Sequence, residues 1–155
     1  MWHQPHISKI YEALTAITDK RIEMVSENEA RCYSSSRGKY YTITYDSKTN
    51  AIMSNDNTAY FTGAISYPMI AFLMLKGIVP YNQALLSPLS NIVWKDIMQK
   101  HKNNYDKGIA EVLEQLAQKG IDTAEIQAKI HLIFQQVCSL SLVQLGQKIF
   151  PPKAY

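Results

Sequence analysis

The chain has 155 residues, of which 46% are hydrophobic and 19% are charged. A chain of this length and composition can bury a core of its own, which excludes an intrinsically disordered protein. Its formal net charge is only +3, far below that of dedicated nucleic-acid-binding modules, so charge alone does not predict nucleic-acid binding.

The first predicted element is a helix over residues 5–18. Apolar residues recur there at every third or fourth position, which places them on one stripe of a helix. Pro5 stands in the first turn, where a helix tolerates proline. The stripe that we expect to cover a sheet consists of Ile7, Ile10, Tyr11, Leu14 and Ile17.

From Lys20 onward the apolar residues occur at every second position, which is typical of strands. Short polar breaks at 26–29, 36–38 and 46–50 join neighbouring strands in an antiparallel meander. Residues 59–62 are a candidate for a fifth strand. The apolar face of the four predicted strands consists of Ile22 with Met24, Ala30 with Cys32, Tyr41 with Ile43 and Tyr45, and Ala51 with Met53.

After Gly63 the pattern becomes helical. Ser66 is a predicted N-cap, and the helix that follows it is apolar on all sides, which indicates burial. A second helix is predicted to begin at Ser87 and Pro88. Two further apolar stripes, the second introduced by a capping box, predict helices; they contain Ile109, Val112, Leu113 and Leu116, and then Asp122 with Glu125 before Ile126, Ile130, Ile133, Phe134 and Val137.

These elements predict an α+β fold, with an N-terminal helix on a four-stranded antiparallel meander and a mostly helical C-terminal half packed on it. The sheet-forming part covers about residues 5–62 and the helical part about 63–150. No linker is long enough to separate two halves. We therefore expect a single domain over residues 1–155.

Cys32 and Cys138 are the two cysteines of the chain, and they form no CxxC or CxxH motif. Their spacing argues against a disulfide framework and a structural zinc site, and it predicts a reducing compartment. The N-terminus lacks the pattern of a secretory signal, and the apolar stretch 64–79 is shorter than the roughly 20 residues of a spanning helix. We expect a cytoplasmic protein without a membrane segment, a metal or a cofactor.

The common catalytic motifs, such as GxSxG, HExxH, the P-loop and GxGxxG, are absent from the sequence, which argues against an enzyme. Cys32 is a possible nucleophile with His101 as its base, but its alternation with Ala30 favours a small core residue. No catalytic residue is assigned. An enzyme of this chain would have a cleft between sheet and helices, lined by several of Tyr41, Tyr45, Tyr60, His101 and Asp106.

Basic and aromatic residues suggest a binding surface. A basic run between residues 95 and 107 contains Lys100, His101, Lys102 and Tyr105, and the outward face of the sheet adds Arg31, Tyr33 and Tyr40. These side chains would grip phosphates and stack on bases, which makes nucleic-acid binding one hypothesis. A solvated loop and cross-strand pairs explain the same residues without a ligand.

The sequence contains ten tyrosines, four of which lie in the predicted meander. Tyrosine is enriched where proteins meet partners. Our leading hypothesis is therefore a protein that acts by binding, through self-association as a homo-oligomer or through another protein. The contact would be edge pairing of the meander or packing of a C-terminal helix through Leu140, Leu142, Val143 and Leu145.

Overall fold

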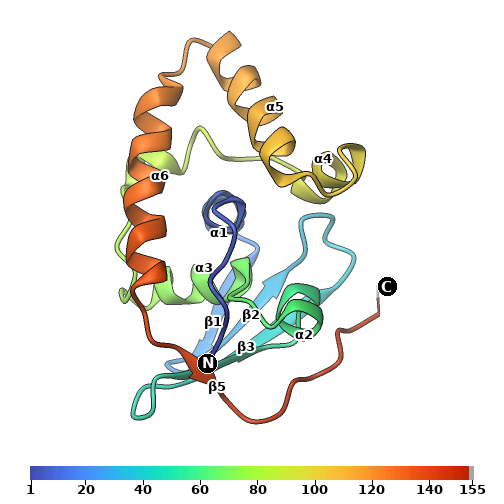
Figure 1. Cartoon of the computed structure of the whole chain (residues 1–155), viewed down its shortest axis with the longest axis vertical. Coiled ribbons are helices and arrows are strands. Elements are labelled where there is room, and N and C mark those ends of the chain that lie inside the picture. Colours follow the sequence, from blue (N-terminus) through green and yellow to red (C-terminus); the bar gives the residue numbers. More distant parts are fainter. Residues whose placement is uncertain (154–155) are drawn as a thin grey trace.

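The computed structural model describes residues 1–153 and has the predicted α+β architecture. A five-stranded sheet occupies one end of the molecule, and the helices of residues 94–118 occupy the other (Figure 1). The N-terminal helix lies between them, and the last helix runs along one side of the molecule down to the sheet. In chain order the elements are α1 (Ser8–Thr18), β1 (Ile22–Ser26), β2 (Glu29–Tyr33), β3 (Tyr40–Asp46), β4 (Ala51–Ser54), α2 (Asn57–Thr62), α3 (Tyr67–Leu75), the 3-10 turn η1 (Gln83–Leu85), α4 (Trp94–Lys100), α5 (Tyr105–Gln118), α6 (Thr123–Cys138) and β5 (Val143–Gln144).

The strands are arranged in the order β1-β2-β3-β4-β5. The first four pair antiparallel, as the meander predicts, with Ala30 opposite Ile43. The fifth pairs parallel with β4, placing Val143 opposite Ala51, so the sheet is mixed. This last pairing was not predicted, because a two-residue strand shows no periodicity in the sequence.

The alternating pattern is confirmed on β2 and β3, where every second residue is buried. On β1 and β4, the outer two strands of the predicted meander, the prediction of which residues are buried is wrong. Met24 on the edge strand β1 is 39% exposed. Every residue of β4 is buried, and Ile52 lies opposite Tyr45 whereas Met53 lies opposite Thr44, so these two apolar side chains take opposite faces. A continuous apolar run does not reveal which face is the inner one.

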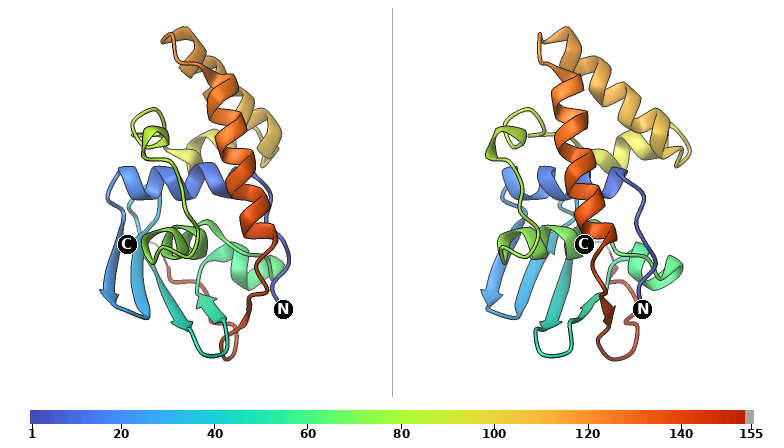
Figure 2. Two further views of the ribbon diagram at one scale, coloured as in Figure 1. Left: turned by 90° about the vertical axis from the view of Figure 1, so that its left-hand side faces the viewer. Right: turned by 60° about the vertical axis from the view of Figure 1, so that its left-hand side comes forward.

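Helix α1 packs against α3, and α3 contacts β1, β3 and β4 (Figure 2). Trp94, at the start of α4, connects the later helices to α1: its Nε1 donates to Oγ1 of Thr15 over 2.9 Å. The Thr15 hydroxyl in turn donates to the carbonyl of Leu89 over 2.7 Å. One hydrophobic cluster includes residues of the sheet, α1, α3, α5 and α6. The helical half therefore packs on the sheet part, as predicted.

Three predicted segments differ from the structure. Residues 59–62 belong to α2, because the Asp56 side chain caps that helix at Ala59 N and Gly63, with φ 66°, ends it. The helix predicted from Ser87 begins only at Trp94, after a series of turns. The apolar stretch 140–145 is extended, with β5 within it, so it forms no C-terminal helix for self-association.

The start of the last helix is confirmed at Asp122, whose side chain accepts a hydrogen bond from Glu125 N. Among residues 1–153, no helix has the length and apolar character needed to cross a membrane.

Candidate functional site

A polar cavity of about 340 Å³ lies where α1, the β2–β3 loop, the start of α2 and α4 meet, and we call it the α1 cavity. It opens to solvent, and charged and hydroxyl side chains make up most of its wall. Its lining residues are Lys9, Glu12, Ser34, Ser35, Lys39, Tyr41, Asp56, Asn57, Thr58, Tyr67, Lys95, Met98, Gln99, Asn103 and Tyr105.

A buried ion pair on α1 forms the inner wall. Lys9 Nζ lies 3.1 Å from Oε2 of Glu12, and their side chains are only 10% and 12% exposed. The enclosed Oε2 accepts no other hydrogen bond from the described residues. Lys9 Nζ also lies 4.8 Å from the centre of the Tyr105 ring. The attraction between the two charges is the main force that holds the pair together.

The pKa of Lys9 is raised above 10.5. Burial, the largest influence, acts to lower it, but the charge of Glu12, the charge of Tyr105, a hydrogen-bond contribution from Glu12 and the charge of Asp56 together outweigh burial. Lys9 is therefore an ammonium group inside the protein at neutral pH.

Asp56 holds the local framework together. Its Oδ2 accepts hydrogen bonds from the hydroxyls of Ser54 and Ser66, each over 2.5 Å, and its Oδ1 accepts from Ala59 N over 2.9 Å. These contacts tie the end of β4 to α2 and to the start of α3. Because its oxygens are occupied by the protein, Asp56 positions the wall of the cavity.

Two tyrosines line the cavity on the sheet side. Burial is the main cause that raises the pKa of both Tyr41 and Tyr67 above 10.0. Each stays a neutral phenol at neutral pH and can donate a hydrogen bond. The Tyr67 hydroxyl lies 3.4 Å from Nη1 of Arg21, which also donates to the Tyr33 carbonyl over 2.7 Å.

Two lysines lie at the mouth of the cavity. Lys39 follows the β2–β3 turn, which Ser34 N closes by donating to the Lys39 carbonyl. Lys95 is the second residue of α4, and its backbone N–H donates to Oγ of Ser35 over 3.2 Å, so the loop and the helix are joined. Burial and then the charge of Lys95 lower the pKa of Lys39, whereas Asp56 acts to raise it. Within residues 1–153 neither lysine forms an ion pair.

Cys32 is fully buried and its pKa is raised to about 12, chiefly by burial. At neutral pH it is a thiol, as expected of a core residue. His101 instead lies 3.2 Å from Oε1 of Glu111. The suggested nucleophile and base are therefore not supported by the environment of either residue.

The residues proposed for binding do not form one surface: some lie on the sheet and others lie on and after α4. Arg31 stacks on the Tyr40 ring at 4.6 Å, and the Tyr33 and Tyr40 rings are 5.7 Å apart across the strands. Cross-strand pairing thus occupies these three side chains.

The remaining residues of that set lie on and after α4. Lys100 Nζ lies 2.5 Å from Oε1 of Glu111, which His101 also contacts, and Lys102 is exposed. Of the proposed set, Tyr105 lines the α1 cavity. Nucleic-acid binding through the others stays a prediction.

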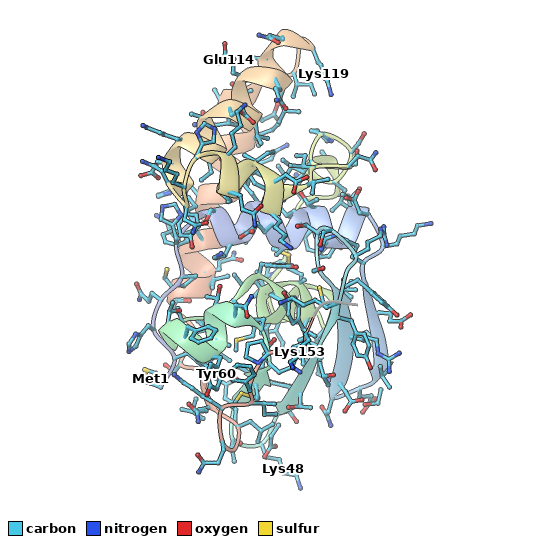
Figure 3. All side chains as sticks on the ribbon, turned by 90° about the vertical axis from the view of Figure 1, so that its right-hand side faces the viewer. Met1, Lys48, Tyr60, Glu114, Lys119 and Lys153 are labelled. Atoms are coloured by element: carbon cyan, nitrogen blue, oxygen red, sulfur yellow. The ribbon has the colours of Figure 1, made fainter. Side chains whose placement is uncertain are left out.

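The cleft suggested for an enzyme has a different lining from the one expected. Of its five suggested residues, Tyr41 lines the α1 cavity. Tyr45 packs on Phe72 in the core, and Asp106 lies 3.2 Å from Nε2 of His6. Tyr60 lies on α2, packed against Phe150 (Figure 3).

The sequence did not indicate Lys9, Glu12, Asp56 or Tyr67. A lysine and a glutamate three residues apart on a helix are typical of a solvated face, and Asp56 looked like part of a polar turn. Among the described residues, no group of three or more His, Cys, Asp or Glu side chains is placed to hold a metal ion.

A family model described as Uncharacterised conserved protein UCP014422 matches residues 2–143. The chain belongs to this family. The match includes every residue that lines the α1 cavity. No curated protein and no solved structure matches the chain.

Proposed function

We propose that this protein binds a small polar molecule in the α1 cavity. One observation carries the proposal: a buried ion pair, Lys9 with Glu12, lines a polar cavity that opens to solvent. Buried charged groups in proteins are normally both paired and hydrogen-bonded, because their desolvation is costly. A bound molecule with donors and acceptors would form hydrogen bonds with the part of the pair that faces the cavity.

The size and rigidity of the cavity support a small ligand. Its volume of about 340 Å³ is near the lower end of the roughly 300–1,000 Å³ of small-molecule sites. Asp56 fixes one wall through three hydrogen bonds, and the contact between Lys95 and Ser35 fixes another. A pre-formed wall lowers the entropy cost of binding.

A thermal-shift screen tests the proposal. Sugars, sugar phosphates, amino acids, organic acids and polyamines would be added one by one to the wild type and to Gln99→Trp. Gln99 is an exposed residue in the lining, so an indole there fills the cavity. We expect at least one compound to raise the Tm of the wild type and not that of the variant.

Gln118→Trp is the matched control, because Gln118 is exposed at the end of α5 and lies outside the cavity lining. It should respond to the ligand like the wild type. A screen without a compound that separates Gln99→Trp from this control would contradict the proposal.

Self-association is a second candidate function, and the edge strand β1 favours it. On β1, Met24 is 39% and Val25 is 53% exposed, and its outer edge is unpaired in the described sheet. An exposed apolar edge strand is a template for pairing with a second copy. This is the edge-pairing route; the helical route has no helix to support it.

Light scattering after size-exclusion chromatography tests this candidate. We expect the wild type to form a dimer and Val25→Lys to shift it to monomer, because a charge on an edge strand blocks pairing. Thr49→Lys, in the exposed turn between β3 and β4, is the control. A wild-type protein that remains strictly monomeric at high concentration would remove this candidate.

We place the protein in the cytoplasm. Cys32 and Cys138 are both free thiols, and Cys138 is partly exposed, which suits a reducing compartment. Cell fractionation with an antibody to the protein tests this location, and recovery in an oxidising compartment would contradict it.

A further inference from the structure

The charges around the α1 cavity are distributed unevenly. Inside, Lys9 is paired with Glu12. Asp56 has its carboxylate enclosed by two hydroxyls and a backbone N–H. At the mouth, Lys39 and Lys95 both line the cavity, and the backbone N–H of Lys95 donates to Ser35 in the loop that precedes Lys39. Two cations thus lie together with no ion-pair partner among the described residues.

Hydrogen-bond donors surround these two lysines. The Ser35 oxygen already accepts from Lys95 N, so its hydroxyl proton is left for another acceptor. Asn57 and Thr58 line the same cavity. Ammonium and hydroxyl donors are the groups that hold an anionic oxygen in protein sites.

The inner part of the cavity offers hydrogen-bond acceptors as well as donors. Lys9 and Glu12 both line the cavity, and their side chains are 10% and 12% exposed. The Tyr41 and Tyr67 phenols stand on the sheet side as donors and acceptors. Alcohol groups, which both donate and accept, fit such a surface.

We infer that the ligand of the α1 cavity is a small hydroxylated molecule with one anionic group, a carboxylate or a phosphate. The anionic group binds between Lys39 and Lys95, and hydroxyl groups of the ligand bind the Lys9–Glu12 pair. This inference rests on the proposed function and adds the chemical class of the ligand to it.

Four probes separate the two halves of the inference in calorimetric titrations. Glucose supplies hydroxyls alone, inorganic phosphate supplies the anion alone, and glucose 6-phosphate and gluconate supply both. We expect at least one of the last two to bind tenfold or more tightly than glucose and phosphate. Which of them binds better distinguishes a phosphate ligand from a carboxylate ligand.

The double variant Lys39→Ala/Lys95→Ala should lose tenfold or more in affinity for that probe. Lys48→Ala/Lys119→Ala is the matched control, since these lysines lie at the two ends of the molecule (Figure 3); it should keep wild-type affinity. Glu12→Gln should weaken glucose 6-phosphate or gluconate severalfold and leave inorganic phosphate unchanged, because a neutral amide is a weaker acceptor than a carboxylate.

Three results would overturn the inference: none of the four probes binds, the anionic probes bind no better than glucose, or the lysine double variant matches its control. If glucose or another uncharged compound still separates Gln99→Trp from Gln118→Trp, the proposed function survives and only the ligand class is wrong. If nothing separates those two variants, the proposed function fails as well.

Discussion

Two sides of α1 are buried but have opposite chemistry. Toward the hydrophobic core it presents Ile10 and Leu14, both 0% exposed. Toward the α1 cavity it presents Lys9 and Glu12, which are 8% and 9% exposed. Burial of the apolar side stabilises the folded protein, because its surface leaves water. Burial of the polar side costs stability, because two charges lose their hydration. One side of α1 thus stabilises the fold, and the other holds a buried ion pair whose desolvation lowers stability.

The largest effect on stability is expected on the apolar side. Leu14→Ala removes a fully buried side chain and should lower the free energy of unfolding by about 3–5 kcal/mol, through lost burial and a residual cavity. Urea unfolding followed by circular dichroism measures it. A loss below about 1 kcal/mol would mean that this side of α1 is not the centre of the core.

A smaller loss is expected when one charge is removed on the polar side. Lys9→Met leaves the Glu12 carboxylate buried without its cation and should cost about 3 kcal/mol. The double variant Lys9→Met/Glu12→Leu, measured in the same urea experiment, should recover most of this loss, because two apolar side chains carry no desolvation penalty.

The double variant also separates stability from function. It should fold about as well as the wild type and no longer bind the ligand of the α1 cavity. Were it as unstable as Lys9→Met alone, the ion pair would be essential to the fold, and the contrast between the two sides of α1 would be lost.

Thr15 makes an intermediate case, because it is a polar residue inside the apolar region. Its hydroxyl accepts from Trp94 Nε1 and donates to the Leu89 carbonyl. Thr15→Val keeps the shape and leaves both partners unsatisfied, which should cost about 2 kcal/mol in urea unfolding. Thr62→Val, at the exposed end of α2, is the control and should change stability by less than about 0.5 kcal/mol. Equal losses in the two variants would show that the buried hydrogen bonds contribute nothing.

The two sides of α1 also differ in how much of them the sequence predicted. The stripe that includes Ile10 and Leu14 predicted the helix and its core side, because apolar residues at helical spacing mark the face that is buried. All four strands of the meander followed from the period of two, and so did the buried faces of β2 and β3. The inner face of β4 did not follow, since an apolar run has no polar positions that mark a face.

The candidate site was mostly not predicted, because its residues meet only through the tertiary fold. Lys9 and Glu12 are spaced like a solvated surface pair, and what buries them is the β2–β3 loop and α4, far along the chain. Lys39 and Lys95 are far apart in the chain, and nothing in their spacing indicates that Ser35 joins their two segments. Tyr105 was proposed for another reason, and it lines the cavity from the start of α5.

The smallest expected effect is a difference in pH dependence between the inner and the outer lysine. The folded-state pKa of Lys9 is raised above 10.5. Its charge therefore stabilises the protein below pH 10.5, and this contribution disappears as the pH rises through the raised value. The stability difference between the wild type and Lys9→Met should accordingly shrink in strong alkali.

Lys39 should behave in the opposite way, because its pKa is lowered from 10.5 by burial and by Lys95. The folded state disfavours its charge, so this penalty is fully present at neutral pH and is relieved as the pH rises through the lowered pKa toward 10.5. Unfolding of Lys39→Met and the wild type, measured from neutral pH to above 10.5, should therefore converge before the Lys9 pair does. If the two lysine variants show the same pH profile, the mouth and the interior of the α1 cavity do not differ in electrostatic character.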